Sequence, residues 1–195
     1  MSGTSRLEGA AAAKANTLLR KVSALFGRHG IRFCIDGGTL LGIVREGRLL
    51  PWDNDLDFFV PADQAPHILK LRWHLLLLGC KLKCSDVLET TGPMPKGGAR
   101  IYKIKLLRRI DGQRIVIDLI FKYPDATHFH WLVGSNPHVH KKVARRFYDT
   151  LETISYEGAT LPVPSDVESY LTERYGDWRT PKKEWNFKTD DHAIV

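Results

Sequence analysis

The sequence predicts an α/β protein in which helices pack beside a small mixed β-sheet. Residues 32–35 are predicted to form a short strand that leads into a glycine pair and a helix-forming segment. Residues 51–60 are an extended run with acids at alternate positions, and residues 99–121 hold two strand-like runs joined by Asp111-Gly112, a two-residue hairpin signal. Because 43% of the 195 residues are hydrophobic, the chain can bury one good core, and we expect a single domain.

The first expected element is an amphipathic helix at about residues 6–27. Its apolar positions follow helical spacing, and they are Leu7, Ala11, Leu18, Val22 and Leu25. Residues 1–13 lack the apolar centre of a signal peptide, and Leu75–Leu78, the longest leucine run, is far too short to cross a membrane. We therefore expect no targeting segment, no membrane span and a cytoplasmic location.

A phosphate cradle is predicted where the strand at 32–35 meets Gly37, Gly38 and Thr39 at the start of a short helix. The glycines let the backbone approach a ligand, and the free N–H groups and the helix dipole attract negative charge. Thr39 would cap the helix or bind a phosphate oxygen, and Arg45, about two turns on, would return its guanidinium to the same anion. Taken alone, the segment is equally typical of a tight turn before a capped helix.

Three acids, Asp53, Asp55 and Asp57, occupy every second position of the next run. Alternate side chains of a strand share a face, so Asp55 and Asp57 would project together. The side chains expected on the opposite face are Leu56, Phe58 and Val60. Neighbouring buried carboxylates repel each other, and a divalent metal relieves that repulsion. A turn is the alternative for residues 51–54, but it does not explain Asp57.

Together, residues 36–42, Arg45 and residues 51–57 resemble the LicD family, which includes bacterial phosphocholine transferases and fukutin-related ribitol-phosphate transferases. That family belongs to the nucleotidyltransferase-fold superfamily, whose hallmark is a Gly-Gly or Gly-Ser turn followed by an Asp-x-Asp strand. Residues 158–185 resemble the closing segment of the family. The resemblance covers most of the chain after the first helix. It implies a nucleotidyltransferase-like mixed sheet flanked by helices, in one domain over residues 1–195.

The superfamily resemblance also implies a third carboxylate on a later strand, and Asp118 is the candidate. It lies inside a β-branched run, where a charge is costly unless it is paired. The alternative is that Asp118 pairs with Lys103 or Lys105 across the predicted hairpin, which would make its role structural. We favour the metal site because three separate motifs converge on it.

These expectations assign roles to the residues. The expected catalytic and metal-binding residues are Asp55, Asp57 and Asp118, with Asp53 supporting them. The expected phosphate-binding residues are Gly37, Gly38, Thr39 and Arg45. Oxygen ligands suit Mg²⁺ and Mn²⁺ alike, and phosphoryl chemistry chiefly needs charge neutralisation and alignment, with Asp118 serving a second ion or acting as base.

The resemblance implies transfer of phosphocholine, phosphoribitol or a similar phospho-alcohol from a CDP-linked donor to a hydroxyl of a glycan or glycolipid acceptor. One alternative is a nucleotidyltransferase that retains the nucleoside monophosphate on a small molecule or RNA. The other is a non-catalytic module that binds an anionic polymer.

A net charge of +7 favours anionic partners, including a nucleotide donor and, peripherally, an anionic membrane surface; nucleic acid is not expected. The basic residues that come in pairs are Arg108-Arg109, Lys141-Lys142, Arg145-Arg146 and Lys182-Lys183. For any single pair, a solvated basic surface is the simpler interpretation.

The three cysteines, Cys34, Cys80 and Cys84, are an odd number and indicate a reducing compartment. We expect Cys34 in the core, while Cys80 and Cys84 could ligate zinc but have no second matched pair. The stretch His128–His140 looks like a loop, and a metal site, a mobile lid and an acceptor-binding loop all remain open for it.

Two further helices are expected. One begins near Pro66 and closes with Leu75–Leu78, and the last covers residues 165–175 with Ser165 as its cap. The segment 177–195 is aromatic and basic, and its tryptophans, Trp178 and Trp185, are expected to pack it onto the domain.

Overall fold

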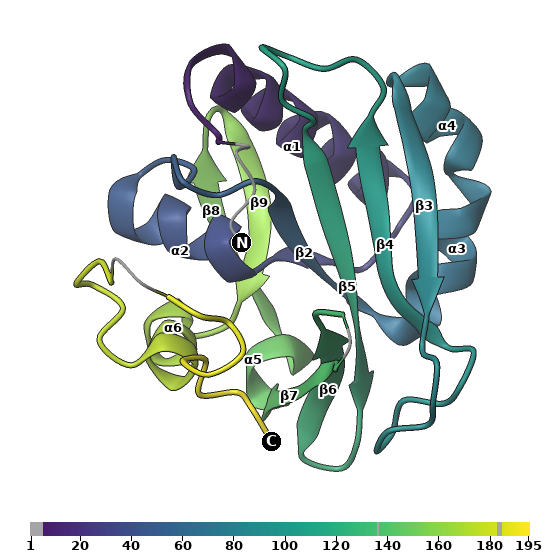
Figure 1. The fold of residues 1–195 in the computed structure, drawn as a ribbon, viewed down its shortest axis with the longest axis vertical. Coiled ribbons are helices and arrows are strands. Elements are labelled where there is room, and N and C mark those ends of the chain that lie inside the picture. The colour runs from purple at the N-terminus through teal and green to yellow at the C-terminus, as the bar shows by residue number, and fades with distance from the viewer. Residues whose placement is uncertain (1–5, 136, 183–184) are drawn as a thin grey trace.

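A mixed seven-stranded sheet forms the centre of the computed structural model, which describes residues 6–135, 137–182 and 185–195 (Figure 1). Its strand order is β1-β2-β5-β4-β3, and β6 and β7 continue from the far end of β5. The strands are β1 Cys34–Ile35, β2 Leu56–Pro61, β3 Cys80–Asp86, β4 Ala99–Leu106, β5 Val116–Pro124, β6 His128–Val133 and β7 Val139–Ala144. A separate two-stranded sheet pairs β8 Leu151–Tyr156 with β9 Ala159–Pro164.

Helices flank this sheet and confirm the predicted mixed α/β fold. They are α1 Gly9–Arg28, α2 Gly37–Glu46, η1 Ala62–Gln64, α3 Ala65–Lys70, α4 Arg72–Leu77, α5 Arg146–Asp149 and α6 Val167–Tyr175. In Figure 1, α1, α3 and α4 lie behind the sheet, while α2 and α6 lie at its left. None of the helices in the described segments has the length and apolar character that crossing a membrane requires.

The alternation predicted for β2 decides which face of the sheet is buried under α1. Leu56, Phe58 and Val60 are fully buried, and they pair in parallel with the equally apolar Ile117, Leu119 and Phe121 of β5. The apolar positions predicted for the first helix are buried as well, although Leu7 precedes α1, which begins at Gly9. The acids of β2 and β5 are thereby left on the opposite face.

Three local expectations were wrong. The helix expected from Pro66 through Leu78 is two short helices, because Leu71 leaves helical geometry between α3 and α4. Asp166 rather than Ser165 caps α6: its carboxylate accepts from the Ser169 N–H, while the Ser165 hydroxyl donates to the Arg146 carbonyl.

The stretch from His128 to His140 was also mispredicted, because it is a hairpin rather than a loop. β6 and β7 pair antiparallel, and Phe129 and Trp131 are buried beneath them. Of the residues that favoured a loop, Pro124 ends β5, while Gly134 and Pro137 lie in the turn between β6 and β7, where Gly134 has a φ of +77°.

Candidate functional site

Four carboxylates gather on one face of the sheet, where β2 and β5 begin. Asp57 and Asp118 are register partners on these parallel neighbours, so their Cα atoms are about 4.8 Å apart and their side chains share a face. Asp55 and Asp53 precede β2 on the segment that leads into this corner. The structure therefore brings all four predicted acids together.

Burial raises the pKa of each of these acids, and repulsion by neighbouring carboxylates raises the pKa values of Asp53, Asp55 and Asp57 further. Desolvation is the largest cause for Asp55, followed by the charges of Asp118 and Asp53, and its pKa rises to about 7. The pKa of Asp57 lies well above its ordinary value, because the group is desolvated and faces the charges of Asp55, Asp53 and Asp118. Such a cluster accepts full ionisation readily only when positive charge is supplied.

The first turn of α2 is joined directly to these acids. The Asp57 carboxylate accepts from the Gly38 N–H at 3.1 Å, and the Asp57 N–H donates to the Thr39 hydroxyl at 2.8 Å. The cap of α2 is Asp36, which accepts from the Gly37 N–H at 2.8 Å, so the capping role considered for Thr39 was wrong. Thr39 instead ties the helix to β2.

The two glycines are required by this close approach. A Cβ on Gly37 would overlap the Asp57 carboxylate, and a Cβ on Gly38 would overlap Oδ2 of Asp53. Gly37 also has a φ of +54°, which L side chains rarely adopt. The glycine pair thus lets the N-terminus of α2 lie directly against the acids. The expected contact of these two glycines with a phosphate stays a prediction.

Asp118 has one paired and one unpaired oxygen. Oδ2 forms an ion pair with the ammonium of Lys103, its register partner on β4. This pairing is the alternative to a metal that the sequence left open. Oδ1 is buried and has no hydrogen-bond partner in the described part of the chain. Among the described residues, no three or more His, Cys, Asp or Glu side chains have the arrangement of a formed metal site.

Arg45 lies at the other end of α2, about 12 Å from Gly37 along the helix axis. Its guanidinium donates to the Trp178 carbonyl at 3.2 Å and to the Glu46 carboxylate at 2.9 Å. In this structure it therefore holds the C-terminal segment, and its expected contact with a phosphate stays a prediction.

A buried polar network beneath the α2 turn was not predicted. Asp36 accepts from Lys122 of β5 at 2.6 Å and from Tyr148 at 3.2 Å, and Tyr170 and Arg174 of α6 also contact it. The charges of Lys122 and Arg174 hold the pKa of Asp36 well below its usual range. Desolvation lowers the pKa of Lys122 to about 8. The sequence signal was a lysine inside the apolar run of β5.

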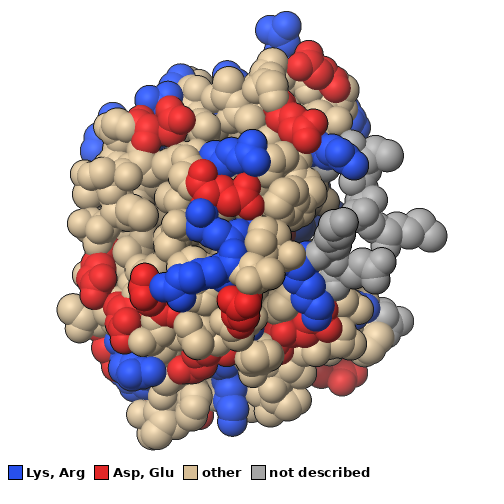
Figure 2. All heavy atoms as spheres, turned by 90° about the vertical axis from the view of Figure 1, so that its left-hand side faces the viewer, with Lys and Arg blue, Asp and Glu red and all other residues tan. Residues whose placement is uncertain are grey.

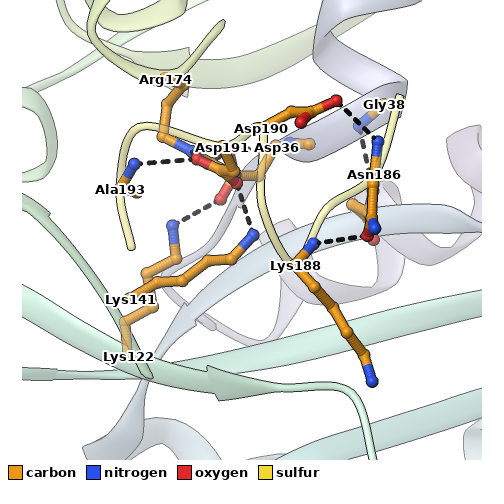
Figure 3. A network of polar contacts seen from close by, with 12 residues as sticks. Asp36, Gly38, Lys122, Lys141, Arg174, Asn186, Lys188, Asp190, Asp191 and Ala193 are labelled. Atoms are coloured by element: carbon orange, nitrogen blue, oxygen red, sulfur yellow. Dashed lines mark hydrogen bonds and ion pairs between the residues drawn. The ribbon is translucent and has the colours of Figure 1, made fainter. Parts of the chain in front are cut away.

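The network continues into the C-terminal segment. Figure 3 shows Lys122 and Lys141 reaching from the sheet toward Asp36 and Asp191, with Arg174 approaching from the other side. Asp191 accepts from Arg174 at 2.7 Å and from Lys141 at 2.6 Å. Trp178 is also buried, which confirms its packing role. The cap of α2 is thus linked through ion pairs to the last residues of the chain.

Other predicted features lie away from the acids. Cys34 is buried as expected, but Cys80 and Cys84 are four residues apart on β3, about 13 Å, which is too far to share one zinc. A hollow of about 320 Å³ lies between α1 and residues 48–51 rather than at the acids. Figure 2 shows basic and acidic side chains interleaved, without one continuous basic patch, on the face formed by α2, α6 and the C-terminal segment.

Known proteins share this domain. A model of the LicD/FKTN/FKRP nucleotidyltransferase domain matches residues 30–166. The human ribitol-5-phosphate transferase FKTN is 26% identical over 179 residues, which are 89% of this chain and 35% of that protein. The lipopolysaccharide cholinephosphotransferase LicD of Haemophilus influenzae is 39% identical over 41 residues, 21% of this chain and 16% of that protein.

The first curated relatives are much longer than the match, since the chain spans about 35% of their length. Among solved structures, the lincosamide adenylyltransferase LnuA aligns with a TM-score of 0.44 and 13% identity over 80% of this chain and 83% of that one, which is too distant to add to the assignment.

Proposed function

The chain belongs to the LicD/FKTN/FKRP family of nucleotidyltransferase domains, and we propose that it is a transferase of phosphorus-containing groups. It moves a phospho-alcohol such as phosphocholine or phosphoribitol from a CDP-linked donor to a hydroxyl of a glycan or glycolipid, and cytidine monophosphate leaves. Its relatives are named as ribitol-phosphate and choline-phosphate transferases, and this supports the class of reaction.

The observation that carries the proposal is the pairing of Asp57 with Asp118 beside the first turn of α2. The raised pKa values of these acids and the unpartnered Oδ1 of Asp118 fit a site for Mg²⁺ or Mn²⁺, since both prefer carboxylate oxygens. Asp55, Asp57 and Asp118 would hold the cation. When bound, it supplies positive charge that neutralises the donor phosphates.

The residues around the acids would bind and orient the donor. The positive end of α2 attracts the donor diphosphate, and Thr39 and Asp36 fix that helix end against β2 and the buried network. The ion pair with Lys103 favours the charged form of Asp118, which is the form that would bind a cation.

The experiment is turnover of CDP-choline, CDP-ribitol and CDP-glycerol, each with and without Mg²⁺ or Mn²⁺, followed by product analysis. Cytidine monophosphate should appear only with metal, and Asp57→Asn or Asp118→Asn should lower its rate at least about 100-fold while the thermal unfolding transition persists. The matched control is Asp177→Asn, at an exposed position on the C-terminal segment. Full activity in the Asp57 and Asp118 variants would reject the proposal.

A nucleotidyltransferase is the second candidate, because the matched domain carries that fold name. Such an enzyme would retain the nucleoside monophosphate on its acceptor and release pyrophosphate. A nucleotide labelled in the base separates the two reactions: the label ends on free cytidine monophosphate in phospho-alcohol transfer and on the acceptor in nucleotidyl transfer.

A further inference from the structure

Helices α3 and α4 are apolar on two sides. Helical hydrogen bonds continue through the break at Leu71, whose N–H donates to the Ile68 carbonyl and whose carbonyl accepts from the Leu75 N–H. The side chains of these three residues are buried in the core. The other side carries large apolar residues at the spacing of one helix face. They are Leu69, Trp73, Leu76 and Leu77, and we refer to them as the apolar ridge.

The apolar ridge is exposed. Trp73 is 71% exposed and Leu77 is 86% exposed, while Leu69 and Leu76 are 41% and 46% exposed. Figure 1 shows α3 and α4 at the right-hand edge of the molecule, outside β3. A helix that is apolar on both sides is ordinarily buried on both, so this surface lacks the partner that would cover it.

Basic side chains lie around the apolar ridge, and acids are absent from its helices. Helices α1, α3 and α4 contain no Asp or Glu. Lys70 and Arg72 are exposed between the residues of the ridge. On α1, the residues Lys14, Lys21 and Arg28 recur at every seventh position, nearly two helical turns, so they form one stripe along the helix. We refer to these three residues as the basic stripe.

Two contacts place the basic stripe on the side of α1 that faces α4. The ring centroids of His29, which follows α1, and His74 of α4 are 4.8 Å apart. Burial raises the pKa of the Cys80 thiol, and the nearby charge of Lys14 opposes that rise. Cys80 begins β3, the strand against which α4 packs. The basic stripe therefore runs beside the helix that carries most of the apolar ridge.

We propose that the apolar ridge and the basic stripe together form a surface that binds an anionic lipid bilayer. Trp73 and the leucines would enter the boundary between headgroups and acyl chains, and the cations would contact lipid phosphates. With six residues each, α3 and α4 would lie in this boundary without crossing it. The acids of β2 and β5 stand on the opposite face of the sheet, so the transfer site stays open while the protein is bound. The inference does not depend on the proposed transfer chemistry.

Charge and side-chain type favour a bilayer over two other occupants. A two-fold contact with a second copy would pair this surface with itself, so that cations would face cations. Nucleic acid matches the cations, but it stacks its bases on aromatic side chains, and Trp73 is accompanied by leucines. Phosphates alone would leave those leucines exposed to water. A bilayer of anionic lipids covers the leucines and neutralises the cations at once.

The test is sedimentation of the protein with vesicles of phosphatidylcholine, alone or mixed equally with phosphatidylglycerol, in the absence of donor and divalent cations. Wild type should bind the mixed vesicles, less tightly as salt is added, and should bind vesicles of phosphatidylcholine alone far more weakly. Trp73→Ser/Leu77→Ser should weaken binding to the mixed vesicles about tenfold or more, because it removes apolar area. Lys21→Gln/Lys70→Gln should weaken it about tenfold, because it removes two cations near the lipid.

Each variant has a matched control. Trp52→Ser/Leu88→Ser removes a tryptophan and a leucine that are 55% and 67% exposed elsewhere on the molecule. Lys142→Gln/Lys188→Gln removes the same charge from exposed positions on β7 and the C-terminal segment. Both controls should bind the mixed vesicles as wild type does. Thermal unfolding checks the fold, and since the two variants test the surface independently, one folded variant is enough to decide.

Equal binding by the variants and their controls overturns the proposal. So does binding to phosphatidylcholine alone that is as tight as binding to the mixed vesicles. Analytical ultracentrifugation and titration with a single-stranded oligodeoxynucleotide test the other occupants. Self-association or oligodeoxynucleotide binding that is lost in the Trp73/Leu77 variant, in a protein that binds no vesicles, would assign the ridge to that occupant and overturn the proposal as well.

Discussion

Asp55→Asn should stabilise the metal-free protein, and only above pH 5. The pKa of Asp55 rises from 3.8 to about 7 in the folded chain, so the folded state holds that proton more tightly than the unfolded state does. The contribution of Asp55 to stability therefore falls as the pH rises from about 4 to about 7. A rise of three pKa units corresponds to about 4 kcal/mol of stability. We reduce this to about 1–2 kcal/mol, because the side chain is only half-buried and its titration depends on that of the neighbouring acids.

The assay is thermal unfolding without divalent cations at pH 4.5 and at pH 8. For a chain of this length, about 1–2 kcal/mol raises Tm by about 2–8 °C, and Asp55→Asn should show that gain over wild type at pH 8 and almost none at pH 4.5. Asp177→Asn, at an exposed site, should show no gain at either pH. Mg²⁺ at pH 8 should then stabilise wild type more than Asp55→Asn. The reasoning is refuted if Asp55→Asn has the lower Tm at pH 8, or if its effect is the same at both pH values.

Further changes test other parts of the site. Lys103→Gln should tighten Mn²⁺ binding in calorimetric titration, because it removes the ammonium that competes for Asp118; weaker binding would contradict this. Gly38→Ala should abolish turnover while circular dichroism stays native, because its Cβ overlaps the Asp53 carboxylate; retained turnover would contradict the close approach. Asp191→Asn should cost about 3 kcal/mol in chemical denaturation by leaving buried cations unpaired, whereas Asp190→Asn, whose partner Lys182 is exposed, should cost less; equal losses would contradict the network.

The acid corner could be predicted because its signals are local. Acids at alternate positions of an apolar strand must share a face, so the grouping of Asp55 with Asp57 followed from strand geometry alone. The hairpin signal at Asp111-Gly112 likewise predicted that the chain turns back and that Asp118 lies on the next strand of the sheet. Both turn residues have the positive φ values that such a turn requires.

The parts that were missed depend on contacts between distant residues. Lys122 and Asp36 are 86 residues apart, and no local pattern indicates that their side chains meet. The register that places Lys103 opposite Asp118 was foreseen only as an alternative, because the strand ends that set it are not visible in the residue pattern. The strands at His128–His140 were obscured by Gly134 and Pro137, which lie in the turn between them. Four successive residues of β6, 129–132, are buried, so this strand offers no alternating pattern.

The central claim is that carboxylates from β2 and β5 together hold a divalent cation, and electron paramagnetic resonance of free Mn²⁺ tests it without relying on turnover. Titrated into wild type at pH 7.5, Mn²⁺ should lose its free signal as it binds, and Asp177→Asn should behave in the same way. Asp57→Asn and Asp118→Asn should each weaken the binding about tenfold or more. Undiminished Mn²⁺ binding in both of those variants would contradict the account.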